Sequence, residues 1–247
     1  MGKILLEAPV FTIEAALKAA EFGVDRIELC SDFAEGGETP SVGALVFLKE
    51  RLNIPIYVMV RPRGGDFVYT SDEIEVMKKD IQILDSFGAD GFVFGVLDST
   101  GEVDAGKCKE LIDAAKGKPC TFHRAFDICA NPNQALETII ECGFRRLLTS
   151  GTCNTLSEGL PIVKGLLNQA KDRIIIMPGG GLQPQHIGSL KESPYLTEVH
   201  GSCKVYRPSE SEFTSDRVQL SKDPNAFRQV LTISKEVVTE FNGVLQR

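Results

Sequence analysis

The sequence predicts a single-domain α/β protein, a (β/α)8 barrel of the TIM type that spans residues 1–247. Eight short apolar runs alternate with helical patterns, and no composition break or linker divides the chain. Barrels of this kind commonly reach such a length as one domain. An open doubly wound sheet is the chief alternative, but the first strand-to-helix joint lacks G-x-G-x-x-G and an eighth strand would be surplus. We therefore expect no nucleotide cofactor.

The strand-like runs are separated by helices with recognisable start signals. Thr12, Asp104 and Asn131 each precede a helical pattern, and Thr70 with Glu73 forms a capping box. The eight runs lie at residues 4–8, 26–30, 54–61, 91–97, 119–125, 146–151, 173–180 and 197–202.

The end of the chain departs from this repeating unit. Residues 204–223 are polar and carry no strand pattern, so we expect a long loop or lid after the eighth strand. A last helix over about 225–244 would then close the ring.

Composition and charge limit the classes of partner. The formal charge of −7 is spread along the chain, which disfavours nucleic acid and anionic membranes as partners. The N-terminus shows no secretion signal, and no apolar run of 18 residues follows it, so we expect a cytoplasmic protein. Seven dispersed cysteines without a C-x-x-C pair are typical of free thiols.

Reactive groups in such barrels come from the carboxyl ends of the strands. Alternation along the first two strands turns Glu7, Glu28 and Cys30 toward the barrel mouth. At the ends of the fifth and eighth strands the sequence places His123 and His200. A single histidine there is usually scaffold, but two histidines and two carboxylates converging on one mouth suggest acid–base chemistry.

Cationic side chains also follow the strands. Arg61 and Arg63 share one parity around Pro62, so we expect both to aim at one target. That target is either an anionic ligand or the carboxylates Glu7 and Glu28 in a structural ion-pair network.

The fifth, sixth and seventh strands add further candidates. Arg124 and Asp127 follow His123 at the rim, with Arg124 as an anion-binding and Asp127 as a catalytic candidate. Ser150 ends the sixth strand, and Gly179, Gly180 and Gly181 follow the seventh. The glycines either make a tight turn or let backbone N–H groups approach a phosphate.

The residues also allow two kinds of metal site. Glu7, Glu28, His123 and His200 form an oxygen and nitrogen set that suits a divalent ion such as Zn²⁺ or Mn²⁺. Cu(I) prefers soft thiolates, for which Cys30 is the main candidate. Further candidate thiols are Cys153 and Cys203.

Several motifs together resemble the CutC family of copper homeostasis proteins. These are DRIELCSDFAEGGETPSVG, RPRGGDF, FHRAFD, LTSG and MPGGG, in this order, over about residues 6–202. The resemblance implies a cytoplasmic TIM-type barrel, a homodimer or homotetramer, and a link to copper. It also implies copper binding by cysteines near the first two strands. Cys30 matches one of these, and Pro9 stands where relatives often have the other.

Two functions from different classes follow. The resemblance implies a copper homeostasis protein that binds Cu(I) through Cys30. The polar residues instead suggest an enzyme acting on a small anionic, phosphorylated metabolite, with His123 and Glu28 or His200 as acid and base. In that enzyme Arg61 and Arg63 would clamp the anion.

Overall fold

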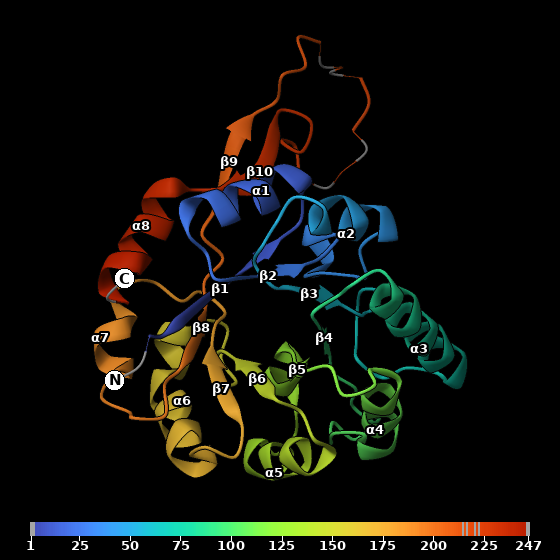
Figure 1. Cartoon of the computed structure of the whole chain (residues 1–247), viewed down its shortest axis with the longest axis vertical. Coiled ribbons are helices and arrows are strands. Elements are labelled where there is room, and N and C mark those ends of the chain that lie inside the picture. The colour runs from blue at the N-terminus through green and yellow to red at the C-terminus, as the bar shows by residue number, and fades with distance from the viewer. Residues whose placement is uncertain (1–2, 214, 216, 220, 222, 246–247) are drawn as a thin grey trace.

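The computed structural model describes residues 3–213, 215, 217–219, 221 and 223–245. Eight parallel strands pair in the order β7-β6-β5-β4-β3-β2-β1-β8, and β7 and β8 touch across the remaining seam. Helices surround this nearly closed barrel (Figure 1). The predicted (β/α)8 architecture is therefore confirmed.

All eight predicted barrel strands are present: seven lie within their predicted runs, and β1 extends two residues beyond the end of its run. Pairing sets their register: Glu7 lies opposite His200, and Pro9 lies opposite Glu28. The bounds are β1 Leu5–Val10, β2 Arg26–Leu29, β3 Ile56–Met59, β4 Gly91–Phe94, β5 Cys120–Phe122, β6 Arg146–Thr149, β7 Ile175–Pro178 and β8 Glu198–His200.

The predicted caps start their helices. The side chains of Thr12, Asp104 and Asn131 accept first-turn N–H groups, and Thr70 and Glu73 form the complete capping box. Among the described residues, no helix has both the length and the apolar character needed to cross a bilayer. The helices are α1 Ile13–Phe22, α2 Val42–Lys49, α3 Ser71–Ser86, α4 Ala105–Ala114, α5 Pro132–Cys142, α6 Leu156–Ala170, α7 His186–Leu190 and α8 Lys235–Val244.

Two kinds of buried layer result. Apolar side chains from the outer faces of the strands, such as Leu6, Ile27 and Val58, pack against the helices. The barrel interior instead buries charged residues, among them Glu7 and Arg26. Side-chain alternation in the strands separates the two layers.

The segment after the eighth strand differs from the prediction. Residues 204–208 are strand β9 (Lys204–Pro208), which pairs antiparallel with β10 (Gln229–Ile233) in a hairpin that projects beyond the barrel (Figure 1). The last helix begins at residue 235 rather than about 225. A loop from 204 and a helix from 225 were therefore wrong. Part of the predicted loop, residues 214, 216, 220 and 222, lies outside the described residues.

The base of the hairpin is attached to α1. Arg207 binds the Glu14 carboxylate at 2.7 Å, and the Thr232 hydroxyl lies 3.2 Å from the same group. The Thr12 hydroxyl donates to the Leu231 carbonyl oxygen. These contacts hold the inner end of β10 over the mouth of the barrel.

Candidate active site

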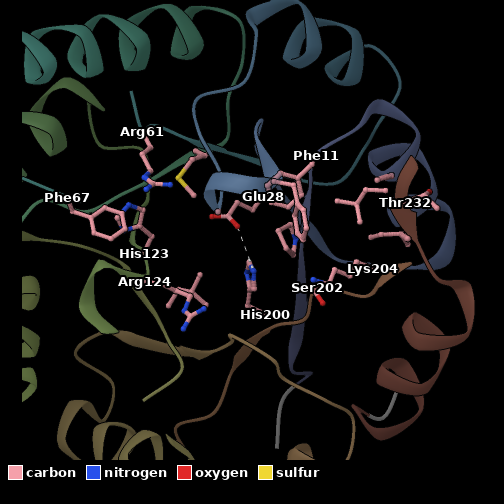
Figure 2. A pocket seen from close by; sticks show the side chains of 18 residues that line it. Phe11, Glu28, Arg61, Phe67, His123, Arg124, His200, Ser202, Lys204 and Thr232 are labelled. Atoms are coloured by element: carbon pink, nitrogen blue, oxygen red, sulfur yellow. Dashed lines mark ion pairs between the residues drawn. The ribbon is translucent and has the colours of Figure 1, made fainter. Parts of the chain in front are cut away.

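A cavity of about 200 Å³ lies at the carboxyl ends of the barrel strands (Figure 2). One part of its wall is apolar and includes Phe11, Phe33, Met59, Phe67, Leu231 and Ile233. Another part is polar and includes Glu28, Arg61, His123, Arg124 and His200. A small apolar pocket with a few convergent polar groups is typical of ligand sites.

Three polar side chains, Glu7 on β1, His200 on β8 and Glu28 on β2, lie next to one another in a row. His200 Nδ1 lies 2.9 Å from Glu7 Oε1, and His200 Nε2 lies 3.7 Å from Glu28 Oε2. Parallel pairing places all three at one end of the sheet. The second carboxyl oxygen of Glu28, Oε1, is buried and has no hydrogen-bond partner within the described chain.

A charged layer lies beneath this chain of residues. The Arg26 guanidinium binds both Glu7 and Glu198, and Arg146 binds Glu198 at 2.7 Å. The Tyr57 ring lies between the two guanidinium groups, with centroid distances of 4.6 Å and 5.1 Å. Two buried cations are thus matched by two carboxylates, as buried charges require.

The side chains of Glu7 and Glu28 have very different pKa values. Burial raises the pKa of Glu7, but the Arg26 charge and the His200 hydrogen bond outweigh it and lower the pKa to about 2. Burial raises the pKa of Glu28 to about 7, against the His200 charge and with the repulsion of Glu7. Burial alone would lower the pKa of His200, but Glu7 and Glu28 raise it. Carboxyls held at different acidities in one site are typical of acid–base pairs.

His123 occupies the opposite wall as a neutral imidazole. Burial and the nearby Arg61 charge lower its pKa to about 3. Its Nδ1 accepts the Ala125 N–H at 3.3 Å, so the single ring proton resides on Nε2. Nε2 is buried and unpartnered within the described residues.

Arg61 is fixed beside His123. Its two terminal nitrogens donate to the carbonyl oxygens of Glu35, Gly37 and Gly65. The guanidinium lies over the Phe67 ring at 4.9 Å. Neutral carbonyls orient this cation without cancelling its charge.

Arg63 does not share that target. It binds Glu73 at 2.6 Å and Asp66 at 3.0 Å, and it is not among the described residues that line the cavity. The expectation that both arginines aim at one target was wrong, because the strand ends at Met59 and alternation fails beyond it. Neither arginine has an ion pair with Glu7 or Glu28 among the described contacts.

Asp127 and Ser150 form a compact rim cluster with Arg124. The Asp127 carboxylate accepts from the Ser150 N–H, the Ser150 hydroxyl and the Thr152 N–H, and Arg124 binds it at 2.7 Å. The amide groups of this loop therefore already surround a carboxylate of the protein itself. Arg124 also lines the cavity.

The glycines after β7 pack behind that rim cluster. A side chain at Gly179 would approach Leu148 to 2.5 Å, and one at Gly180 would approach the Arg124 guanidinium carbon to 2.9 Å. Gly181 has φ +88°, which a glycine adopts readily. Close packing explains Gly179 and Gly180, and the turn explains Gly181; phosphate binding by their N–H groups stays a prediction.

A match to a protein-family model shows the family of this chain. The model of the CutC family matches residues 4–205, well over half of the sequence. The chain belongs to the CutC family. The matched range includes Cys30, Arg61 and His123.

CutC relatives match most of the chain. It is 46% identical over 216 residues to the human "copper homeostasis protein cutC homolog", covering 87% of this chain and 79% of that protein. It is 39% identical over 243 residues to a CutC family protein of Klebsiella pneumoniae, covering 98% and 97%. A solved CutC structure from Streptococcus agalactiae has a TM-score of 0.75 at 30% identity, covering 81% of this chain and 98% of that one.

The three candidate copper-binding thiols of this CutC chain differ in their burial and surroundings. Burial, with repulsion from Glu28 and Glu7, raises the pKa of the Cys30 thiol well above its usual value. Cys203 is buried in the apolar core, and burial raises its pKa to about 12. Cys153 is partly exposed and offers its carbonyl oxygen to Ser150.

The structure brings together three of the four residues that were predicted to bind a divalent metal ion. Glu7, Glu28 and His200 have ligand atoms within 4.8 Å of one another, and in the described chain neither His123 nor a cysteine joins that group. Both Glu7 oxygens are already bound, one by Arg26 and one by His200. A divalent ion would share Glu7 with Arg26 and His200, whereas Glu28 Oε1 has no hydrogen-bond partner in the described chain, so a divalent site at these three residues stays a prediction.

Sequence reasoning missed part of the site. Arg26 and Glu198 share parity with Glu28 and His200 on their strands, so alternation alone would have placed them in the interior. Leu231 and Thr232 reach the cavity only because the hairpin folds back over α1, and no local pattern indicates that.

Proposed function

We propose that this CutC protein is an enzyme that moves a proton on a small anionic metabolite bound in the barrel mouth. Glu28 is the group that takes up and returns the proton. The observation that carries this proposal is Glu28 Oε1, a buried acceptor in the cavity wall without a partner in the described chain. An unpartnered buried acceptor costs free energy unless a ligand uses it.

The neighbours of Glu28 suit this role. Its pKa near 7 keeps both protonation states accessible at neutral pH, which is the optimum for a general acid or base. Ionised Glu7 accepts from His200 Nδ1 and so orients the His200 ring toward Glu28. The fixed charge of Arg61 attracts an anionic substrate to the same cavity.

A matched metabolite panel tests the proposal. Pyruvate, phenylpyruvate and dihydroxyacetone phosphate carry a ketone, and lactate, phenyllactate and glycerol 3-phosphate carry the corresponding alcohol. Proton NMR in D2O follows exchange or conversion of each compound. We expect turnover that Glu28→Gln lowers by about 100-fold or more. Glu21→Gln, on the exposed face of α1, is the control.

Two results contradict the proposal. One is turnover that survives in Glu28→Gln at the rate of the control. The other is a panel of which no member raises the melting temperature of the wild-type protein.

A second candidate function is Cu(I) binding, as the names of the curated relatives suggest. Cys30 packs with Met59 inside the barrel, and a methyl group at Gly37 would lie 3.5 Å from both Cys30 Sγ and the Met59 terminal carbon. A thiolate and a thioether are soft ligands that Cu(I) prefers.

Competition against a Cu(I) chelator under anaerobic conditions tests this candidate. We expect Cys30→Ser to weaken binding most and Met59→Leu to weaken it less. Cys108→Ser, at a thiol buried between helices and strands, is the control. Equal affinity in all variants contradicts it. Cytoplasmic location and a homodimer or homotetramer remain predictions, and sedimentation measures the latter.

A further inference from the structure

The wall facing Glu28 holds a buried donor without a visible role in the fold. His123 lines the cavity, and its Nε2 has no hydrogen-bond partner in the part of the chain that the structure describes. His123 is 4% exposed, so solvent does not replace the missing acceptor. Because a buried polar atom without a partner is destabilising, this donor is expected to serve a ligand.

The ring is held so that this donor cannot turn away. Phe67 packs on it with ring centroids 4.7 Å apart, and the Ala125 N–H holds Nδ1. A side chain at Gly95 would approach Nδ1 to 2.8 Å, so glycine makes room for the imidazole there. The donor is thus positioned before any ligand binds, as electrostatic catalysis requires.

The charge of Arg61 makes the electrostatic potential near His123 positive. Its guanidinium shares the Phe67 ring with His123 and is fixed by backbone carbonyls. An oxygen that gains negative charge is therefore stabilised near His123 Nε2.

We propose that His123 Nε2–H and Arg61 receive the carbonyl oxygen of the substrate, which is accordingly a small ketone, aldehyde or 2-oxoacid. This inference rests on the proposed function of Glu28. Among the residues that line the cavity, the buried atoms without a partner in the described chain are one acceptor, Glu28 Oε1, and two donors, His123 Nε2 and Arg61 Nε. A carbonyl compound with a hydrogen on the adjacent carbon offers its oxygen to the donors and its C–H to the acceptor.

The reaction class follows from this placement. The Glu28 carboxylate removes the proton from the carbon next to the carbonyl, and the C–H electron pair forms a carbon–carbon double bond. The carbonyl π electrons move to the oxygen, which becomes an enolate oxygen bound by His123 Nε2–H. Return of the proton from Glu28 completes exchange or isomerisation without an oxidant or reductant. The apolar wall of Phe11, Phe33 and Leu231 excludes water from the enolate.

The ketone and alcohol panel distinguishes this inference from the proposed function. We expect the ketones to exchange the proton next to the carbonyl for deuterium. His123→Ala should lower that rate by about 100-fold or more, as loss of one oxyanion donor does. His123→Asn retains an N–H donor and should recover part of the rate.

Each alternative outcome decides one of the two claims. Glu28-dependent exchange of the proton next to the carboxylate in lactate or phenyllactate, without exchange in the ketones, overturns the carbonyl inference and leaves the proposed function intact. Exchange of ketones at full rate in folded His123→Ala also overturns the inference. If that variant does not fold, the ¹⁵N shift of His123 Nε2 in the wild-type protein decides, since no change at saturating phenylpyruvate contradicts the inference.

Discussion

The barrel interior contains two layers, one above the other, that differ in whether their buried polar groups are paired. In the lower layer the cations Arg26 and Arg146 are matched by the carboxylates Glu7 and Glu198. In the upper layer Glu28 Oε1 and His123 Nε2 lie in a cavity wall without partners among the described residues. Arg146 Nη1 also lacks a partner within the described chain, but the lower layer pairs each buried cation with a carboxylate. The upper layer instead leaves an acceptor and a donor for a ligand.

The two layers meet at Glu7. One of its oxygens binds Arg26 below and the other binds His200 above. The same carboxylate thus balances a buried cation and orients the imidazole beside Glu28. We therefore predict that substitutions in the lower layer lower the stability of the protein. Substitution of Glu28 in the upper layer should instead remove activity and raise stability.

Removing the cation of the lower layer should have the largest effect. Arg26→Met leaves Glu7 and Glu198 without this partner, so we expect a loss of about 3–5 kcal/mol in the free energy of unfolding. Arg63→Met breaks only partly exposed pairs and should cost about 1 kcal/mol or less. Urea titration measures both. Equal losses in the two variants would remove the distinction between the layers.

Exchanging the two glutamates for glutamine should move stability in opposite directions. At pH 8, Glu7→Gln removes a charge that Arg26 needs and should cost roughly 2–4 kcal/mol. Glu28→Gln removes a carboxylate that is unfavourable when buried and should add roughly 1–3 kcal/mol. Thermal or urea unfolding compares them. A Glu28→Gln protein less stable than wild type would show that Glu28 is structural.

The stabilisation from Glu28→Gln should depend on pH. The pKa of Glu28 is raised from 4.5 to about 7 on folding, so the native protein retains a proton that the unfolded chain has lost between these values. Wild-type stability therefore falls as pH rises from 4.5 to 7, by at most about 1.4 kcal/mol per pH unit from this group. The difference between variant and wild type should grow over that window and level off above pH 7. A difference that is constant with pH contradicts the raised pKa.

The hairpin contact should have the smallest effect on stability. Arg207→Ala removes a partly exposed ion pair with Glu14, and we expect a loss of about 1 kcal/mol or less. Because β10 forms part of the cavity wall, ligand binding should weaken more than stability. Calorimetric titration with phenylpyruvate, alongside urea unfolding, separates the two effects. An unchanged affinity would show that the hairpin does not shape the cavity.

Local sequence patterns predicted most of the barrel. Strand runs and helix caps depend on neighbouring residues, so Thr12 and the Thr70 capping box could be identified directly. Alternation also placed Glu7 and Glu28 correctly within the barrel. It failed at Arg63, which lies beyond the strand end. Strand β9 was missed because its residues, KVYRP, are mostly exposed and show no apolar alternation with a buried face.

The sequence by itself determined the eightfold alternation and the polar residues at the strand ends, because period and capping are local properties of the chain. Only the tertiary structure decided which of those residues are partnered. Barrel closure brings β8 beside β1, so His200 meets Glu7 across 193 positions of sequence. The same closure leaves Glu28 and His123 facing one cavity. Burial and distance, which no local pattern encodes, then set their acidity and their free hydrogen-bonding atoms.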